Sequence, residues 1–146
     1  MAKYANGKYQ IMHLEKYVGR KVPTYRSSWE HTFMRFCDNN PAVLQWASEA
    51  IHINYRNPFT GKNTIYVPDF FVMYIDANGK QHAEVIEVKP IKETTLENAG
   101  RSQKAQAAAI LNMAKWEAAR QWCKAHGLSF RVITEQDIYA MGGGRK

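Results

Sequence analysis

The chain has 146 residues, of which 45% are hydrophobic and 23% are charged. This length and composition indicate one folded domain and exclude a two-domain enzyme or a globally disordered protein. The net charge of +7, from 20 Lys and Arg against 13 Asp and Glu, favours an anionic partner such as nucleic acid. No apolar run approaches the roughly 20 residues of a membrane span, and no signal-peptide pattern is visible, so we expect an intracellular protein without membrane contact.

The charges are distributed unevenly along the chain. Residues 1–29 contain six basic and one acidic side chain, residues 30–99 six and nine, and residues 100–146 eight and three. Chance variation among solvated faces can produce such a pattern. A metal-dependent enzyme acting on a polyanion also requires it, because carboxylates hold the cation while Lys and Arg neutralise the phosphates of the substrate.

The N-terminal third is predicted to hold a basic arm and one helix. Residues 1–24 lack a clean hydrophobic period and carry mainly basic charges, so we predict a partly ordered arm in which Arg20 and Lys21 contact DNA. The following Ser27-Ser28-Trp29-Glu30 has the S-x-x-E form of a capping box, and a helix is predicted from there to about Asn39. No regular element is predicted between Pro41 and Trp46.

Three strands are predicted in the middle of the chain. Apolar and polar residues alternate over 51–55, as in a half-buried strand, and turn residues occupy 57–61. Residues 64–75 are rich in β-branched and aromatic side chains and predict a second strand. The Asp-Ala-Asn-Gly sequence at 76–79 predicts a hairpin turn into a third strand over 83–89.

The C-terminal third is predicted to be mainly helical. An Ala-rich stretch with an apolar stripe predicts a long helix over 102–126, which Gly127 ends. A short buried strand at 130–133 and a last helical turn at 134–137 follow, and residues 141–146 are predicted to form a flexible tail. The order of elements therefore indicates an α/β fold with an αβββαβ core.

Two short motifs place charges inside apolar strand runs: Val67-Pro68-Asp69-Phe70 and Glu87-Val88-Lys89. Side chains alternate across a strand, so Glu87 and Lys89 point to the same face, where unpaired charges would be costly. If the hairpin pairs the two strands, Asp69 converges with them, and carboxylate oxygens are the ligands that Mg²⁺ prefers. For either motif alone, the alternative is a solvated edge with a weak ion pair, or an ordinary turn.

These motifs resemble those of the PD-(D/E)XK nuclease superfamily, whose restriction-endonuclease-like fold has the αβββαβ order predicted above. Within this superfamily, the sequence resembles more specifically the head-completion nucleases of tailed phages and their TnsA-type relatives. It spans about residues 25–135 and implies a nuclease domain over 25–140, with a mixed central sheet flanked by helices. Four blocks carry it: Tyr25-Arg26-Ser27-Ser28-Trp29-Glu30, Trp46-Ala47-Ser48-Glu49, Tyr66-Val67-Pro68-Asp69-Phe70 and Glu87-Val88-Lys89-Pro90.

The resemblance also implies roles for four side chains. Asp69 and Glu87 would bind Mg²⁺, for which Mn²⁺ would substitute, and Lys89 would position or activate the attacking water. Glu30 would complete the metal site directly or through water. The competing interpretation of Glu30 is the capping box itself, in which its carboxylate accepts a hydrogen bond from the Ser27 amide.

Further residues are expected to support the site or contact DNA. Glu49 would orient a basic residue such as Arg26 or accept a water, although a solvated strand start is an equal alternative. Tyr25 and Arg26 precede the first helix, where they can contact phosphate, stack on a base or form ordinary cap contacts. Lys104 and Lys115 on the long helix are candidate phosphate contacts, although a charged outer face is the usual explanation for such rows.

These features predict a metal-dependent DNA endonuclease that acts at phage head completion, after packaging, in the bacterial host cytoplasm or in association with the virion. DNA is the expected partner, with a homodimer and phage head or portal proteins as further candidates. Two alternatives stay open: a non-catalytic, DNA-end-binding or portal-associated head protein, and a TnsA-like transposase subunit. A non-catalytic binder gains nothing from carboxylates that face phosphates without a metal, which favours the enzyme.

Overall fold

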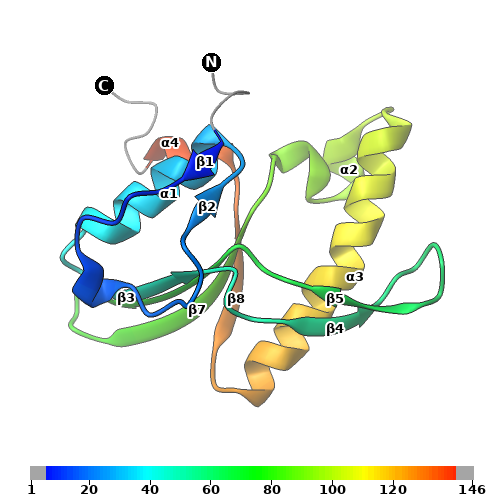
Figure 1. Cartoon of the computed structure of the whole chain (residues 1–146). Helices are drawn as coiled ribbons and strands as arrows, with labels where there is room; N and C mark the ends of the chain where they lie inside the picture. The colour runs from blue at the N-terminus through cyan, green and yellow to red at the C-terminus, as the bar shows by residue number, and fades with distance from the viewer. Residues whose placement is uncertain (1–5, 141–146) are drawn as a thin grey trace.

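The computed structural model describes residues 6–140, which form a central β-sheet with helices on both sides (Figure 1). The predicted tail, 141–146, and the first five residues of the predicted arm lie outside the described residues. Over residues 6–140, no helix combines the length and hydropathy needed to cross a membrane. In chain order the elements are β1 (Gly7–Lys8), 3-10 helix η2 (Leu14–Lys16), β2 (Thr24–Tyr25), α1 (Ser28–Asn39), β3 (Val43–Ser48), β4 (Ile53–Arg56), β5 (Asn63–Tyr66), β6 (Phe70–Ile75), β7 (Gln81–Val88), 3-10 helix η3 (Ile91–Glu93), α2 (Leu96–Ala99), α3 (Gln103–Ala125), β8 (Ser129–Ile133) and α4 (Glu135–Ala140).

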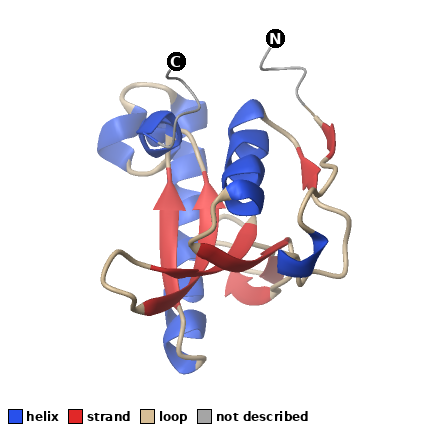
Figure 2. Cartoon of the chain, turned by 90° about the vertical axis from the view of Figure 1, so that its left-hand side faces the viewer, coloured by secondary structure: helices blue, strands red, loops and turns tan. Residues whose placement is uncertain are grey.

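The central sheet has four strands in the order β3-β6-β7-β8. The pairs β3–β6 and β6–β7 are antiparallel, whereas β7 and β8 are parallel. A parallel pair needs a long crossover, and α3 provides it by running along the face of the sheet opposite α1 (Figure 2). The predicted mixed α/β fold, with an αβββαβ order of core elements, is therefore confirmed.

The prediction of the individual strands was wrong in two places. The first strand of the sheet is β3, in a segment where no element was predicted, while the predicted 51–55 strand forms as β4 outside the central sheet. The predicted 64–75 strand is divided into β5, which pairs with β4, and β6, which pairs with β7. The division occurs around Pro68, which has no amide hydrogen to donate to a ladder.

The two faces of the sheet bury separate apolar clusters. Helix α1 packs on one face, in a cluster that includes Phe33, Met34, Cys37, Trp46, Phe70, Val72, Ile86 and Ile133. Helix α3 covers the other face and the β4–β5 hairpin, in a cluster that includes Ile53, Tyr55, Tyr66, Trp116 and Ala119. Burial of these side chains is the main favourable contribution to folding, and it fixes the sheet between two rigid layers.

The described part of the basic N-terminal segment is packed against the domain. Asp38 of α1 is fully buried and accepts hydrogen bonds from the Tyr9 hydroxyl at 2.6 Å and from the Met12 and His13 amides at 2.8 and 3.0 Å. The Lys16 ammonium donates to the Asp38 carbonyl at 3.0 Å. Truncation of this segment would expose buried groups, so its basic side chains are better tested by point substitution.

We predict that Asp38→Ala destabilises the protein by about 3 kcal/mol, because it leaves a buried hydroxyl and two amides without their acceptor. Urea denaturation measures the change, and limited proteolysis should show faster cleavage within residues 6–24. The exposed Glu97, changed to Ala, serves as the control, with an expected effect within about 0.5 kcal/mol. Equal stabilities of the two variants would contradict the anchoring role of Asp38.

Candidate active site

Two carboxylates meet where β6 begins and β7 ends. The register pairs Phe70 with Ile86, which brings Asp69, just before β6, next to Glu87. Asp69 Oδ2 accepts a hydrogen bond from the Val88 amide at 2.8 Å, and Glu87 Oε1 accepts one from the Asp69 amide at 3.3 Å. Each carboxylate is therefore held by the backbone of the opposite strand.

Tyr66 and Lys89 add a hydrogen bond and a charge to this pair. The Tyr66 hydroxyl donates to Glu87 Oε1 at 2.8 Å, and the Lys89 ammonium lies 3.8 Å from Glu87 Oε2. No functional role was predicted for Tyr66. The available signal was a tyrosine in an apolar strand close to Asp69, because a buried tyrosine hydroxyl usually needs a partner.

Burial and repulsion alter the ionisation of both carboxylates. Burial raises the pKa of Asp69 well above its usual value, and the charges of Glu87 and Glu30 raise it further, while the Val88 amide acts in the opposite direction. Burial also raises the pKa of Glu87, against the lowering effect of Lys89. Two negative charges that are poorly solvated and close together favour the binding of a cation or of a proton.

Glu30 lies close to this pair but is engaged by the helix terminus. Its Oε1 accepts a hydrogen bond from the Arg26 amide at 2.9 Å, and its own amide donates to the Ser27 hydroxyl at 3.1 Å. The Glu30 carboxylate therefore caps the helix through the amide of Arg26, the residue before Ser27, and not through the Ser27 amide considered above. Burial raises the pKa of Glu30, and the charge of Glu30 in turn raises the pKa of Asp69.

The carboxylate oxygens of Asp69 and Glu87 are of the kind that Mg²⁺ prefers as ligands. Within residues 6–140 there is no group of three or more His, Cys, Asp or Glu side chains arranged to hold a metal. Mg²⁺, however, is often bound by only one or two carboxylates, with waters and substrate phosphates as its other ligands. Asp69 and Glu87 offer such oxygens, whereas Glu30 would first have to release the Arg26 amide.

A second cluster of charges forms beside the carboxylates, around Glu49. The backbone of Glu49 has a φ of 51°, a conformation that is uncommon for a residue with a side chain. Its amide donates to the Asp69 carbonyl at 2.9 Å, and its carboxylate forms ion pairs with the Lys21 ammonium at 2.7 Å and with the Arg26 guanidinium. These contacts hold two basic groups next to the segment that carries Asp69.

The remaining residues that were predicted to contact DNA are Lys115, Lys104, Arg20 and Tyr25. Lys115 lies over the rings of Tyr66 and Tyr55, at 5.6 and 5.9 Å from their centroids, and burial together with the charge of Lys89 lowers its pKa. Lys115 is therefore brought to the carboxylates.

Lys104 is exposed and, within residues 6–140, forms no hydrogen bond or ion pair with the carboxylates. Arg20 is likewise exposed, and Tyr25 packs against the ring of His31, with a centroid distance of 4.6 Å.

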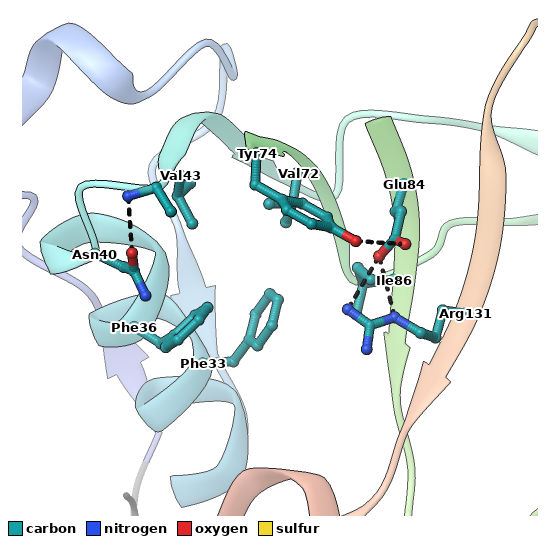
Figure 3. A pocket seen from close by; sticks show the side chains of 10 residues that line it. Phe33, Phe36, Asn40, Val43, Val72, Tyr74, Glu84, Ile86 and Arg131 are labelled. Carbon is teal, nitrogen blue, oxygen red and sulfur yellow. Dashed lines mark hydrogen bonds and ion pairs between the residues drawn. The ribbon is translucent and has the colours of Figure 1, made fainter. Parts of the chain in front are cut away.

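A separate pocket of about 250 Å³ lies on the α1 face of the sheet (Figure 3). Phe33, Val72 and Ile86 form part of its apolar wall. At its edge Glu84 accepts a hydrogen bond from the Tyr74 hydroxyl at 2.9 Å and forms an ion pair with Arg131 at 3.0 Å. Glu84 and Glu87 are three positions apart on one strand and point to opposite faces, so this pocket is distinct from the carboxylate site.

The raised pKa of Asp69 predicts how stability depends on pH. Between the usual aspartate pKa and the raised one, the folded state binds more protons than the unfolded chain, so the metal-free protein loses stability as pH rises through this interval. Asp69→Asn keeps an acceptor for the Val88 amide but removes the charge. We expect this variant to have a higher Tm than the parent at pH 7 without metal, and a flatter dependence of Tm on pH.

Thermal melts between pH 4 and 8 test this expectation, with Glu97→Gln as an exposed control. Mg²⁺ at 100 times its dissociation constant should stabilise the folded parent by about 2.7 kcal/mol and so raise its Tm. The same Mg²⁺ should have little effect on the Tm of Asp69→Asn. A lower Tm of Asp69→Asn than of the parent throughout the pH range would contradict the repulsion between the two carboxylates.

Comparison with known proteins identifies the family. Residues 40–135 match the family described as TnsA-like endonuclease, N-terminal. The chain is also 33% identical to the head completion nuclease of Enterobacteria phage T4, over 94% of this chain and 95% of that protein. The family match runs from just before β3 to the start of α4, and it includes Asp69, Glu87 and Lys89. The chain therefore belongs to the TnsA-like endonuclease family.

Proposed function

We propose that this protein is an endonuclease that hydrolyses DNA phosphodiester bonds with the help of Mg²⁺ or Mn²⁺. The observation that carries the proposal is the pair of the half-buried Asp69 and the buried Glu87, with the Lys89 ammonium 3.8 Å from Glu87. Anionic oxygens beside a fixed ammonium match what phosphodiester hydrolysis requires, namely a cation site and a positive charge near the phosphate. The endonuclease family and the nuclease relative support the same chemistry.

Each side chain of the site then has a defined task. Asp69 and Glu87 hold the cation, and their orientation is fixed by the Val88 amide and the Tyr66 hydroxyl. A bound divalent cation lowers the pKa of water and offsets negative charge on the phosphate. Lys89 donates to a phosphate oxygen or to the attacking water, because its stem leaves a buried strand end and its ammonium points to the carboxylates.

The surrounding basic groups position the DNA backbone. Lys115 provides a second ammonium near the carboxylates and is held over two tyrosine rings. Lys21 and Arg26 contact phosphates next to the scissile bond, and Glu49 keeps them oriented while no DNA is bound. Glu30 would add a further oxygen to the cation site if its carboxylate left the Arg26 amide. More distant phosphates are contacted by exposed basic residues and a neighbouring tyrosine: Arg20, Lys104 and Tyr25.

In biological terms, we infer a role in phage head completion, after DNA packaging and in the cytoplasm of the bacterial host. The similarity to the phage relative covers 94% of the chain, more than the 40–135 region shared with the TnsA-like family, which favours head completion over transposition. A purely structural head protein has no use for two poorly solvated carboxylates that repel each other, because such a pair lowers stability unless a cation binds.

Cleavage is expected to depend fully on a divalent cation, because Asp69 and Glu87 would otherwise repel the phosphate that they must approach. The assay follows the cutting of linear and circular DNA in Mg²⁺, in Mn²⁺ and in excess EDTA. Activity should be lost in EDTA and return when Mg²⁺ is added. Undiminished cutting in EDTA would rule out the proposed cation site.

Lys89→Ala should lower the cleavage rate at saturating DNA by at least about 100-fold, the scale of losing one preorganised charge at a transition state. Folding and DNA affinity should remain near those of the parent, because Lys89 is one of many basic groups. The matched control is Lys92→Ala, which removes an exposed ammonium three residues away. If both variants cut at the parental rate, the charge cluster has a structural role only.

A further inference from the structure

The β4–β5 hairpin, residues 53–66, is a separate two-stranded sheet that the proposed chemistry uses only through Tyr66 and Tyr55. Its register runs from Ile53 opposite Tyr66 to Arg56 opposite Asn63, and a loop over 57–62 closes it. One face packs on α3, whereas the loop projects beyond α3 into solvent (Figure 1). We call this element the hairpin arm.

The tip of the hairpin arm is rigid although it is exposed. The Asn57 side chain accepts hydrogen bonds from the amides of Phe59 at 2.8 Å and Thr60 at 3.2 Å, and the Gly61 amide donates to the Asn57 carbonyl at 2.8 Å. Gly61 has a φ of +72°, which glycine adopts without strain. The Phe59 side chain is thereby presented with 58% of its surface exposed from a backbone that is already held, so little backbone entropy remains to be lost on binding.

The charge of the hairpin arm is entirely positive. No Asp or Glu occurs between Glu49 and Asp69, while Arg56 is the last residue of β4 and Lys62 the last residue of the loop, next to β5. Both basic side chains are exposed, and neither forms an ion pair with another residue of the described 6–140 region. An exposed aromatic ring between two unpaired cations complements a polyanion that also offers apolar surface.

The hairpin arm is physically joined to the carboxylate site. Tyr66, at its base, donates a hydrogen bond to Glu87, and Asp69 follows three residues later. At about 3.3 Å per strand residue, Lys62 lies about 13 Å along the strand from Tyr66. DNA that reaches the carboxylates is therefore within reach of the tip.

We propose that the hairpin arm binds duplex DNA beside the scissile phosphate, with Arg56 and Lys62 on phosphates and Phe59 on apolar base edges in the major groove. The major groove admits a two-stranded β-ribbon, and Phe can contact the thymine methyl group there. This proposal rests on the proposed DNA cleavage but concerns binding, which can be measured separately.

The test measures the affinity of the full-length protein for a fluorescent DNA duplex by anisotropy, without divalent cation and at several salt concentrations. Arg56→Ala and Lys62→Ala should each reduce the steepness of log affinity against log salt by about 0.9, because each phosphate contact releases a counterion. Phe59→Ala should weaken binding by about tenfold or more without changing that slope, the scale of removing a buried Phe contact. Phe59→Leu should retain most of the affinity.

Two matched controls belong to the experiment. Lys80→Ala removes an exposed lysine from the β6–β7 turn, and Leu96→Ala removes an exposed apolar side chain, so neither should change affinity or slope. If the arm variants bind as these controls do, while the parent cuts DNA, the arm proposal alone is overturned. If the parent binds through the arm but cuts no DNA with Mg²⁺, the proposed function fails and the arm stands. A parent that binds no duplex without a divalent cation overturns the arm proposal, and one that also cuts no DNA with Mg²⁺ overturns both.

Discussion

The repulsion between Asp69 and Glu87 is the interaction around which the rest of the structure is arranged. Neither carboxylate is well solvated, and the charge of Glu87 adds to burial in raising the pKa of Asp69. The Tyr66 hydroxyl and two backbone amides hold the pair in place, but they do not neutralise it. The apolar clusters on both faces of the sheet must therefore supply the stability that this pair removes.

The topology distributes positive charge around this anionic centre from distant parts of the chain. Lys21 and Arg26 arrive from the N-terminal segment through their shared ion pairs with Glu49. Lys115 arrives from the crossover helix α3, which must lie against the sheet because β7 and β8 are parallel. The alternation of basic and acidic regions along the sequence thus becomes a basic shell around two carboxylates.

Local patterns predicted much of this arrangement, because they depend on residues close in sequence. The capping box of α1, the turn between β6 and β7 and the apolar stripe of α3 each involve neighbouring positions. The structure also brings Asp69, Glu87 and Lys89 together, as strand alternation and the hairpin turn predicted. Strand β3 escaped prediction because it is apolar on both faces and lacks alternation. The bond from Tyr66 to Glu87 joins residues 21 apart, which no local pattern encodes.

The position of the β4–β5 hairpin has a consequence for how relatives can diverge. The hairpin is inserted between β3 and β6, which are hydrogen-bonded neighbours in the sheet, so its length does not set their register. Its base is tied to the carboxylate site through Tyr66, whereas the loop at 57–62 closes its far end. Insertions, deletions and substitutions at the loop can therefore accumulate without displacing Asp69 and Glu87, so relatives can differ there and keep the same carboxylate site.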